Sequence, residues 1–422
     1  MHPRVRGFAP PELRASSGRA DLVPPQTHRS KHGAILGYAP EIQRRNERSV
    51  NHEQLHVLMV GPGLDVAGGI SAVVNHWLAA GLGERVKLRY IATLDGRDAR
   101  FPARKLYSAA RAYASFGLAT PTRPDIVHVH LSTGASFYRK LGILEAARLR
   151  KLKTVVHLHG SRFMEFYAQS SARRARLIRR VFDRADAVIV LSGAWRDFVR
   201  GFSSNPNVHI LHNGANRAMF GPRADNGDEI VISSMGRLGT RKGTWDLLEA
   251  FKRLAAEVPN VRLVLGGDGE IDKARSIVER DGLEGRVTIA GWLSGAEKLD
   301  VFNRTDIYAL PSYHEGLPAS IIEAMAAGAP IVSTPVGGIP EAVTEAYNGF
   351  LVAPGDVDAL HDRLRKLSLD ADLRDRMGRR SRHLMEEHFE LDTLLERLVD
   401  VYRRTLRSDE RRGPRLKPAV PG

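Results

Sequence analysis

The sequence predicts an α/β protein with two doubly wound domains, because short runs typical of buried strands alternate with helical stretches in two successive series. The strands of the first series are expected at residues 55–60, 87–91, 126–130, 154–159, 187–190 and 208–211. Those of the second series are expected at 230–235, 261–266, 287–290, 307–310, 331–333 and 349–352. A polar stretch from Asn216 to Asp228 separates the two and is typical of a linker. Each series therefore favours its own parallel sheet, covered by helices on both faces.

Composition limits the class of protein. The chain has 422 residues, of which 43% are hydrophobic and 26% charged, as in globular proteins of two or three domains. It contains no cysteine, which excludes disulfides, thiolate nucleophiles and cysteine-ligated metals. No apolar run reaches the roughly 18 residues that a membrane-spanning helix needs, and no apolar segment follows the N-terminal positive charges as in a secretory signal. We therefore expect a cytoplasmic protein.

The domain bounds follow from these patterns and from the distribution of charge. Residues 1–50 are rich in Pro, Arg, Ser and Gly and are expected to form a disordered basic tail, with a second basic tail at 409–422. The N-terminal domain, 51–223, carries 26 Lys and Arg against 11 Asp and Glu. The C-terminal domain is expected at 224–383, and residues 224–400 carry 21 Lys and Arg against 31 Asp and Glu. The positive charge of the chain thus belongs to one half and to the tails.

Two glutamates stand eight positions apart in the second series. Glu315 follows the strand expected at 307–310, and Glu323 falls in the first turns of a helix that we expect to begin near Pro318. Both would lie at the carboxyl edge of the sheet, where open parallel sheets bind ligands. There they could accept hydrogen bonds from sugar or ribose hydroxyls. The alternative is a pair of solvated carboxylates favoured by the dipole at a helix start.

Two cations follow the first strand of the second series. Arg237 comes directly after Gly236, and Lys242 precedes Gly243 just before a helix that we expect to begin at Thr244. A forked donor, a point charge and helix N-terminal amides together suit a diphosphate. The alternative is a pair of surface cations without a ligand.

The N-terminal half has its own glycine pair, Gly68-Gly69, at the start of the first helix. Backbone without side chains can approach a phosphate closely there. As a dinucleotide-binding fingerprint the segment fails, because Val66 stands where the third glycine should be.

Two histidines, His157 and His159, alternate near the end of a strand and therefore share one face of the sheet. Two histidines on one face could bind a metal, but no third ligand is evident nearby. We expect His159 to lie at the cleft edge as a hydrogen-bond donor; the alternative is a packed core histidine. No Asp-x-Asp with the context of a metal-bound nucleotide site follows a strand, so we expect no metal, and Arg237 and Lys242 would neutralise the phosphates instead.

These segments together resemble the retaining glycosyltransferases of family 4, which have the GT-B architecture of two facing Rossmann-like domains. The resemblance covers roughly residues 55–405. The motifs that carry it are Gly68-Gly69, residues 155–160, Gly236-Arg237 with Lys242-Gly243, Gly291-Trp292-Leu293, the Glu315 and Glu323 pair, residues 334–341 and residues 348–352.

The resemblance implies transfer of a sugar from a nucleoside diphosphate sugar of the UDP or GDP type, with no cofactor required. It also implies that the final helices, about 384–408, cross back to the N-terminal domain. By resemblance, Glu323 would bind the ribose, and Glu315 and His159 would contact the donor sugar. The diphosphate would be bound by Arg237 and Lys242, with backbone contributions from Gly69, Gly316 and Leu317. Trp292 and Leu293 would lie near the base, and Gly68 and Gly236 would also belong to the donor site.

The resemblance implies that the N-terminal domain meets the acceptor, and its basic character then suggests an acidic or membrane-borne acceptor, such as a glycan or a lipid-linked sugar. The resemblance also favours bacterial polysaccharide or lipopolysaccharide synthesis as the setting. In the segment 173–184, arginines surround Leu177, Ile178, Val181 and Phe182, which could place this helix on an anionic membrane as a peripheral contact. The alternative is an ordinary helix that packs through those four residues.

Two other functions stay open at this point. A sugar-nucleotide processing enzyme of the epimerase or phosphorylase type could use the same fold. A nucleic-acid-binding protein is prompted by the sequence pI of about 10.2, but no recognition motif is present, and we expect no nucleic-acid partner.

Overall fold

The computed structural model describes residues 54–94, 102–119 and 123–407. Residues Glu53–Gly422 form one compact unit, which contains every described residue. The two tails expected at 1–50 and 409–422 lie outside the described residues.

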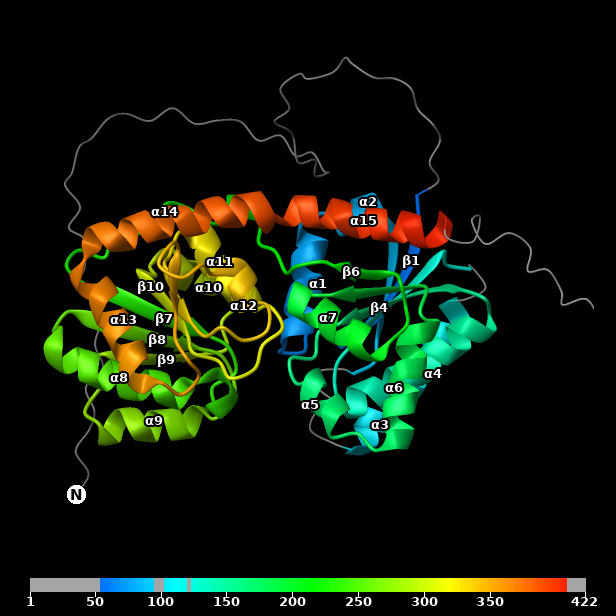
Figure 1. Ribbon diagram of the computed structural model, residues 1–422, viewed down its shortest axis with the longest axis horizontal. Helices are drawn as coiled ribbons and strands as arrows, with labels where there is room; N and C mark the ends of the chain where they lie inside the picture. The colour runs from blue at the N-terminus through cyan, green and yellow to red at the C-terminus, as the bar shows by residue number, and fades with distance from the viewer. Residues whose placement is uncertain (1–53, 95–101, 120–122, 408–422) are drawn as a thin grey trace, which may run out of the picture. The chain divides into compact units, whose positions relative to one another are not determined.

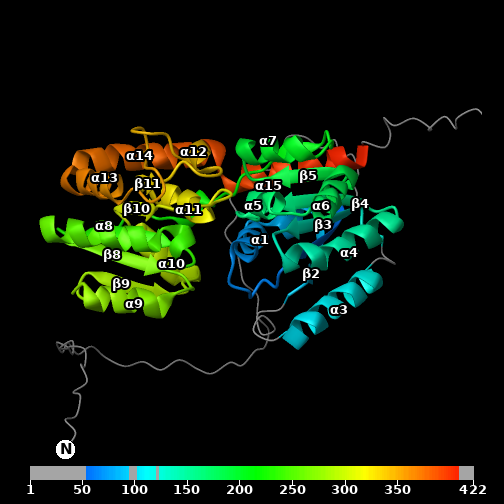
Figure 2. The same cartoon turned by 60° about the horizontal axis from the view of Figure 1, so that its bottom comes forward.

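Two six-stranded parallel sheets form the framework (Figures 1 and 2). The first sheet has the order β2-β1-β3-β4-β5-β6 and consists of β1 (His56–Gly61), β2 (Lys87–Ala92), β3 (Ile126–Leu131), β4 (Lys153–Leu158), β5 (Ala187–Val190) and β6 (Val208–Ile210). The second has the order β12-β11-β10-β7-β8-β9 and consists of β7 (Ile230–Met235), β8 (Val261–Gly266), β9 (Val287–Gly291), β10 (Ile307–Leu310), β11 (Ile331–Ser333) and β12 (Gly349–Leu351). Every expected strand is thus confirmed to within one or two residues.

Helices connect the strands and cover both faces of each sheet. Those after the strands of the first sheet are α1 (Gly69–Ala79), α2 (Leu82–Arg85), α3 (Pro102–Ala119), α4 (Ala135–Leu149), α5 (Phe163–Ala168), α6 (Ala172–Arg184) and α7 (Gly193–Phe202). Those after β7 are α8 (Thr244–Glu257), α9 (Ile271–Arg280), α10 (Gly295–Asn303), α11 (Ala319–Ala327), α12 (Ile339–Ala342), α13 (Val357–Leu369), α14 (Ala371–His388) and α15 (Leu391–Arg407). Short 3₁₀ helices, η3 (Arg217–Met219) and η4 (Thr240–Lys242), complete the chain. We call the first sheet with its helices the first lobe, and the second sheet with its helices the second lobe.

Side-chain alternation along the strands sorts the first lobe into two apolar layers. On β3, Val127 and Val129 pack with residues of α3 to α7, whereas Ile126 packs with α1 and α15. His128 and His130 alternate with these valines and therefore share the face of α1 and α15. Both faces of the strand are buried, as expected of a central strand in a parallel sheet.

The last helix belongs to the first lobe by packing. Leu394, Leu398 and Tyr402 of α15 lie in one apolar cluster with Val57 of β1 and Val155 of β4. The preceding helix, α14, packs on α11 in the second lobe. The chain therefore crosses between the lobes at the junction of α14 and α15. The domain bounds expected from the sequence, 51–223 and 224–383 with about 384–408 returning, remain a prediction.

Backbone hydrogen bonds join this crossing to Ala215, the residue just before the linker. Leu391 donates its backbone N–H to the carbonyl of Ala215 at 3.1 Å, and Ala215 donates to the carbonyl of Phe389 at 3.1 Å. Two chain crossings thus lie side by side and are hydrogen-bonded to each other.

Candidate active site

The order of the strands reverses between β10 and β7 in the second sheet. From β7 the chain proceeds to β8 and β9 on one side, and then from β10 to β11 and β12 on the other. Open parallel sheets bind ligands at the carboxyl ends of the strands beside such a reversal. β7 ends at Met235 and leads to Arg237 and Lys242, and β10 ends at Leu310 and leads to Glu315. The two neighbouring strands thus deliver all three side chains to one edge of the sheet.

Lys242 and Glu315 form a largely buried ion pair at this edge. The distance from Lys242 Nζ to Glu315 Oε1 is 2.6 Å, and the side chains are 13% and 7% exposed. Ser312 donates to the same carboxylate oxygen at 2.8 Å, and an Arg241 nitrogen lies 3.8 Å from it. A buried carboxylate is thus compensated by a cation and a hydroxyl, as burial of a charge requires.

Two glycines allow this pair to form. Gly236 has a φ of 155°, and a Cβ on it would lie 3.0 Å from Lys242 Cε. Gly243 has a φ of 66°, and a Cβ on it would lie 2.0 Å from the carbonyl oxygen of Pro311. A side chain at Gly236 would displace the Lys242 side chain, and one at Gly243 would separate η4 from the segment after β10.

Arg237 reaches the same edge but has a different partner. Its side chain is 66% exposed, and its NH1 lies 2.8 Å from Oδ2 of Asp268, which follows β8. The structure therefore brings Arg237 to the predicted place on the sheet without pairing it to Lys242 or Glu315.

Glu323, in α11, is buried with two nitrogen partners. Lys298 Nζ lies 2.6 Å from its Oε1, and His76 Nε2 lies 3.4 Å from the same atom. Burial lowers the pKa of His76, although the Glu323 carboxylate opposes that shift, so we treat this contact as one to a neutral imidazole. The other oxygen, Oε2, is buried and has no hydrogen-bond partner among the described residues.

A cavity of about 450 Å³ opens beside Glu323. The second lobe contributes Trp292, Leu293 and Lys298 to its lining, and α1 of the first lobe contributes Asn75 and His76. Trp292 is 50% exposed, which is unusual for so large an apolar ring. Both predicted base-contact residues and Glu323 thus line one cavity between residues of both lobes.

The segment from Glu315 to Leu317 also contacts the first lobe. Asn213 donates its side-chain amide to the carbonyl of Leu317 at 2.5 Å, and Trp195 Nε1 lies 3.4 Å from the carbonyl of Glu315. The backbone N–H groups of Gly316 and Leu317 have no hydrogen-bond partner in the part of the chain that the structure describes. Two neighbouring amide donors therefore remain available beside the ion pair.

Gly68 and Gly69 begin α1 beside the reversal of strand order between β1 and β3 in the first sheet. A Cβ at either position would meet no protein atom within 4 Å, so packing does not require glycine there. Their predicted approach to a phosphate stays a prediction.

His159 belongs to a layer of four imidazoles, of which only His157 and His159 were predicted from the sequence. His128 and His130 of β3 stack at 4.5 Å between ring centroids, and the rings of His157 and His159 approach to 4.0 Å. His128, His130 and His157 have no exposed area, whereas His159 is partly exposed. The signal was present, since His128 and His130 alternate on β3 as the other two do after residue 155, and parallel pairing sets His130 opposite His157.

The layer adds two further histidines, His128 and His130, to the pair noted in the sequence. Nitrogens of His128, His130 and His157 lie within 4.8 Å of one another. A metal must lie in the plane of each imidazole that binds it. The His128 and His130 planes are inclined by only 21° and stacked, so their lone pairs do not converge on one point. The arrangement therefore favours hydrogen bonding over metal binding.

Burial of these rings predicts a loss of stability in mild acid. Burial lowers the pKa of His128 and of His159 to about 3 from an ordinary value of 6.5. Below pH 6.5 the unfolded chain binds protons that the folded chain excludes, so this stabilisation is complete above pH 6.5 and is lost as the pH falls toward 3. At pH 5 each ring should reduce the free energy of unfolding by about 2 kcal/mol.

Urea unfolding between pH 7.5 and 5 measures this effect. His128→Phe should flatten the pH dependence by about one proton, because the folded state then no longer excludes a proton from this ring. A wild-type free energy that is constant over this interval would contradict the expected burial of neutral rings.

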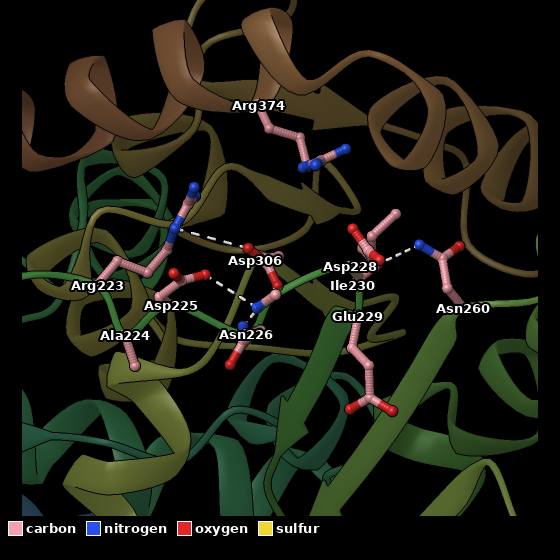
Figure 3. Close-up of a pocket in the computed structure, with 11 residues that line it drawn as sticks. Arg223, Ala224, Asp225, Asn226, Asp228, Glu229, Ile230, Asn260, Asp306 and Arg374 are labelled. Atoms are coloured by element: carbon pink, nitrogen blue, oxygen red, sulfur yellow. Dashed lines mark hydrogen bonds and ion pairs between the residues drawn. The ribbon is translucent and has the colours of Figure 1, made fainter.

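A second cavity lies at the opposite edge of the second sheet (Figure 3). Its lining includes Ile230 and Asp306, which are at or next to the first residues of β7 and β10. Asn226 donates to Asp306 Oδ2 at 2.8 Å, and Arg223 lies 3.6 Å from its Oδ1. These groups satisfy one another where the linker enters the sheet, and we assign no ligand to this cavity.

Three partners of the predicted residues escaped the sequence analysis. Lys298 and His76 contact Glu323, and Asp268 contacts Arg237. Two of these residues have a signal in the sequence: Lys298 comes shortly after Trp292-Leu293, and Asp268 lies in a glycine-rich strand end. The sequence contains no signal for His76, because the contact of His76 with Glu323 joins residues of different lobes.

Comparison with known proteins identifies the chain. The family of the glycosyl transferases group 1 matches residues 216–384, and the glycosyl transferase 4-like domain matches residues 68–214. The chain is a glycosyltransferase. This glycosyltransferase is therefore an enzyme, and the family matches favour transfer over the two alternatives that the sequence left open.

Individual relatives of this glycosyltransferase support the same conclusion. It is 26% identical over 304 residues to glycogen synthase of Mycobacterium tuberculosis, covering 70% of this chain and 72% of that protein. It is 28% identical over 301 residues to the putative colanic acid biosynthesis glycosyltransferase WcaL of Escherichia coli, covering 67% of this chain and 71% of that protein. The structure of Anabaena HepE in complex with UDP-glucose matches with a TM-score of 0.67 and 20% identity, over 82% of this chain and 99% of that one. The fold is GT-B, as the resemblance implied.

No helix among the described residues of this glycosyltransferase is both long and apolar enough to span a membrane.

Proposed function

We propose that this glycosyltransferase transfers a hexose, with retention of the anomeric configuration, from a nucleoside diphosphate sugar to a glycan or lipid-linked acceptor. The setting would be the synthesis of bacterial cell-surface polysaccharide or lipopolysaccharide. WcaL is named for colanic acid biosynthesis, and HepE is described with UDP-glucose, which supports a nucleotide-sugar donor, with UDP the first candidate.

One observation carries the assignment of the site. At the reversal between β7 and β10, a buried ammonium and carboxylate lie beside two unpartnered backbone amides, those of Gly316 and Leu317. A diphosphate needs cationic and amide donors, and the adjoining sugar needs a carboxylate acceptor. The Lys242 and Glu315 pair offers both in one place.

The remaining roles follow from position. Glu323 Oε2 would accept hydrogen bonds from the ribose, and Trp292 with Leu293 would face the base across the same cavity. Arg237 would exchange its exposed Asp268 partner for a phosphate. Gly68, Gly69 and Gly236 would bring backbone close to the phosphates.

The chemistry requires stabilisation of a leaving diphosphate. As the anomeric carbon–oxygen bond breaks, negative charge grows on the diphosphate, and Lys242, Arg237 and the two amides are placed to stabilise it. The acceptor oxygen would then attack from the face that the diphosphate leaves, and a phosphate oxygen would take the acceptor proton. The cations would supply the neutralisation that a divalent metal provides elsewhere.

The donor is tested by a thermal-shift panel of UDP, GDP and their sugars, since a ligand that binds the native state raises its melting temperature. We expect a shift with one nucleotide class and a product of retained configuration by proton NMR. An inverted product would contradict the proposed mechanism, and a flat panel would contradict the proposed donor class.

We further propose that the first lobe meets an anionic membrane surface through electrostatics alone. Ile178, Val181 and Phe182 of α6 are buried in the core of the first lobe. The apolar side of this helix therefore packs inside the protein, as in the alternative given above. Arg179 and Arg180 on its other side are exposed. Each cation near an anionic surface contributes roughly 1 kcal/mol. The location would be the inner face of the cytoplasmic membrane.

Liposome flotation tests this contact. We expect binding to anionic vesicles but not to neutral ones, and weaker binding for Arg179→Glu/Arg180→Glu or at raised salt. Arg275→Glu/Arg280→Glu, at two exposed sites on α9 of the second lobe, makes the same change in net charge and is the matched control. Equal and negligible binding to both vesicle types would exclude the membrane contact.

A further inference from the structure

The buried imidazole layer is linked to the candidate site through one hydrogen bond. Nδ1 of His130 lies 2.9 Å from Nε2 of His159. His130 has no exposed area, and its other nitrogen, Nε2, is buried without a partner among the described residues. His159 is the partly exposed member of the layer, and its carbonyl oxygen would lie 4.0 Å from a Cβ on Gly316 of the second lobe.

The partnerless nitrogen decides which way this hydrogen bond runs. If His159 donated to His130, the proton of His130 would sit on Nε2, as a buried N–H with no acceptor. If His130 donates, Nε2 carries only a lone pair. Buried N–H groups without an acceptor are rarer in proteins than acceptors that lack a donor, so the second arrangement is favoured. His159 Nε2 is then the acceptor, and the proton of His159 is on Nδ1.

We propose that His130 is a positioning residue that makes His159 a neutral hydrogen-bond donor, with its N–H at Nδ1 directed to the donor sugar. The proposal rests on the proposed function only for the identity of the sugar. Nδ1 of His159 has no protein partner within the described ranges. His130 thereby converts an imidazole that could equally accept into one that donates.

The surroundings keep both rings uncharged. Burial first, and the neighbouring histidines and the buried Lys140 next, hold the pKa of His130 well below its ordinary range. Burial, with His128 and Lys140, lowers the pKa of His159 to about 3. His157 packs against both rings and Trp77 packs against His130, and neither brings a carboxylate. A neutral imidazole has one donor, so the choice of nitrogen determines what His159 can bind.

The tautomer can be read directly by NMR. In protein labelled with ¹⁵N-histidine, long-range proton–nitrogen correlations report which ring nitrogen carries the proton, and a His159→Asn sample assigns the signals. We expect Nδ1–H for His159 in the wild type. His130→Phe keeps the ring shape but removes the donor, so the proton should move to Nε2. His130→Asn can donate from its amide and should restore Nδ1–H. His128→Phe, an equally buried change on the same strand, should leave Nδ1–H in place.

An Nε2–H tautomer or a charged His159 in the wild type overturns the proposal, as does an unchanged tautomer in His130→Phe. If His130→Phe fails to fold, the wild-type and His130→Asn spectra still decide. These results need no substrate and so are independent of the proposed function. With the donor found by thermal shift, His130→Phe should lower kcat about tenfold without changing KM, and His130→Asn should recover it, because one hydrogen bond is lost in the transition state.

Discussion

Replacement of Lys242 with methionine should lower kcat by about 10²- to 10³-fold, because it removes an ammonium aimed at the charge that develops on the leaving diphosphate. Methionine keeps much of the length of the buried stem, so the loss is chiefly one of charge. Glu315 would be left with Ser312 and, at 3.8 Å, Arg241. Some destabilisation is therefore expected as well, and melting temperatures must accompany the kinetics.

Two variants separate catalysis from stability. Lys252→Met removes a lysine from α8, which begins two residues after Lys242; its side chain is 45% exposed and paired with Asp281, and activity should be unchanged. In Lys242→Met/Glu315→Gln the buried charge is neutralised, so stability should recover while activity does not. A Lys242→Met enzyme with wild-type kcat and KM would remove this lysine from the mechanism.

Replacement of Glu323 with glutamine should weaken the binding of UDP about 10- to 100-fold, equivalent to roughly 1.5–3 kcal/mol for a hydrogen bond to a charged group. The buried and unpartnered Oε2 is the atom expected to accept from the ribose. Calorimetric titration of wild type and variant measures the difference. Glu297→Gln, an exposed position on α10, is the control and should bind normally.

Deoxyribose analogues of UDP make this test specific to the ribose of the nucleotide. UDP that lacks the relevant ribose hydroxyl should bind weakly to the wild type, and Glu323→Gln should cause little further loss, because both changes remove the same interaction. Additive losses would place the Glu323 carboxylate elsewhere on the nucleotide or away from it.

The fold was predictable because the physical signals for it are local. Buried runs such as 126–130 and 307–310 are short, apolar and rich in branched side chains, and turns with glycine or proline bound them. The helix after Pro318 begins at Ala319, because proline suits a helix start. Strand order was not predicted, because the rules for parallel crossover connections narrow the possible orders without choosing one.

The partners of the site residues were less predictable, because they depend on contacts between distant parts of the chain. Lys242 and Glu315 were expected at one edge, but their pairing with each other depends on the exact approach of η4 to the segment after β10. The preference of Arg237 for Asp268 depends on an exposed rotamer. His128 and His130 alternate as His157 and His159 do, but the layer of four rings depends on the register between β3 and β4, which is not a local signal.

We expect a nucleoside diphosphate at the carboxyl ends of β7 and β10, where the strand order reverses, with its phosphates against Lys242 and its ribose against Glu323. A crystal structure of the complex with the nucleotide that gives the largest thermal shift tests it most directly. We predict phosphate oxygens within hydrogen-bond distance of Lys242 Nζ and the Gly316 and Leu317 amides, and ribose hydroxyls at Glu323 Oε2. A nucleotide bound at any other edge or cavity of the protein would contradict the account.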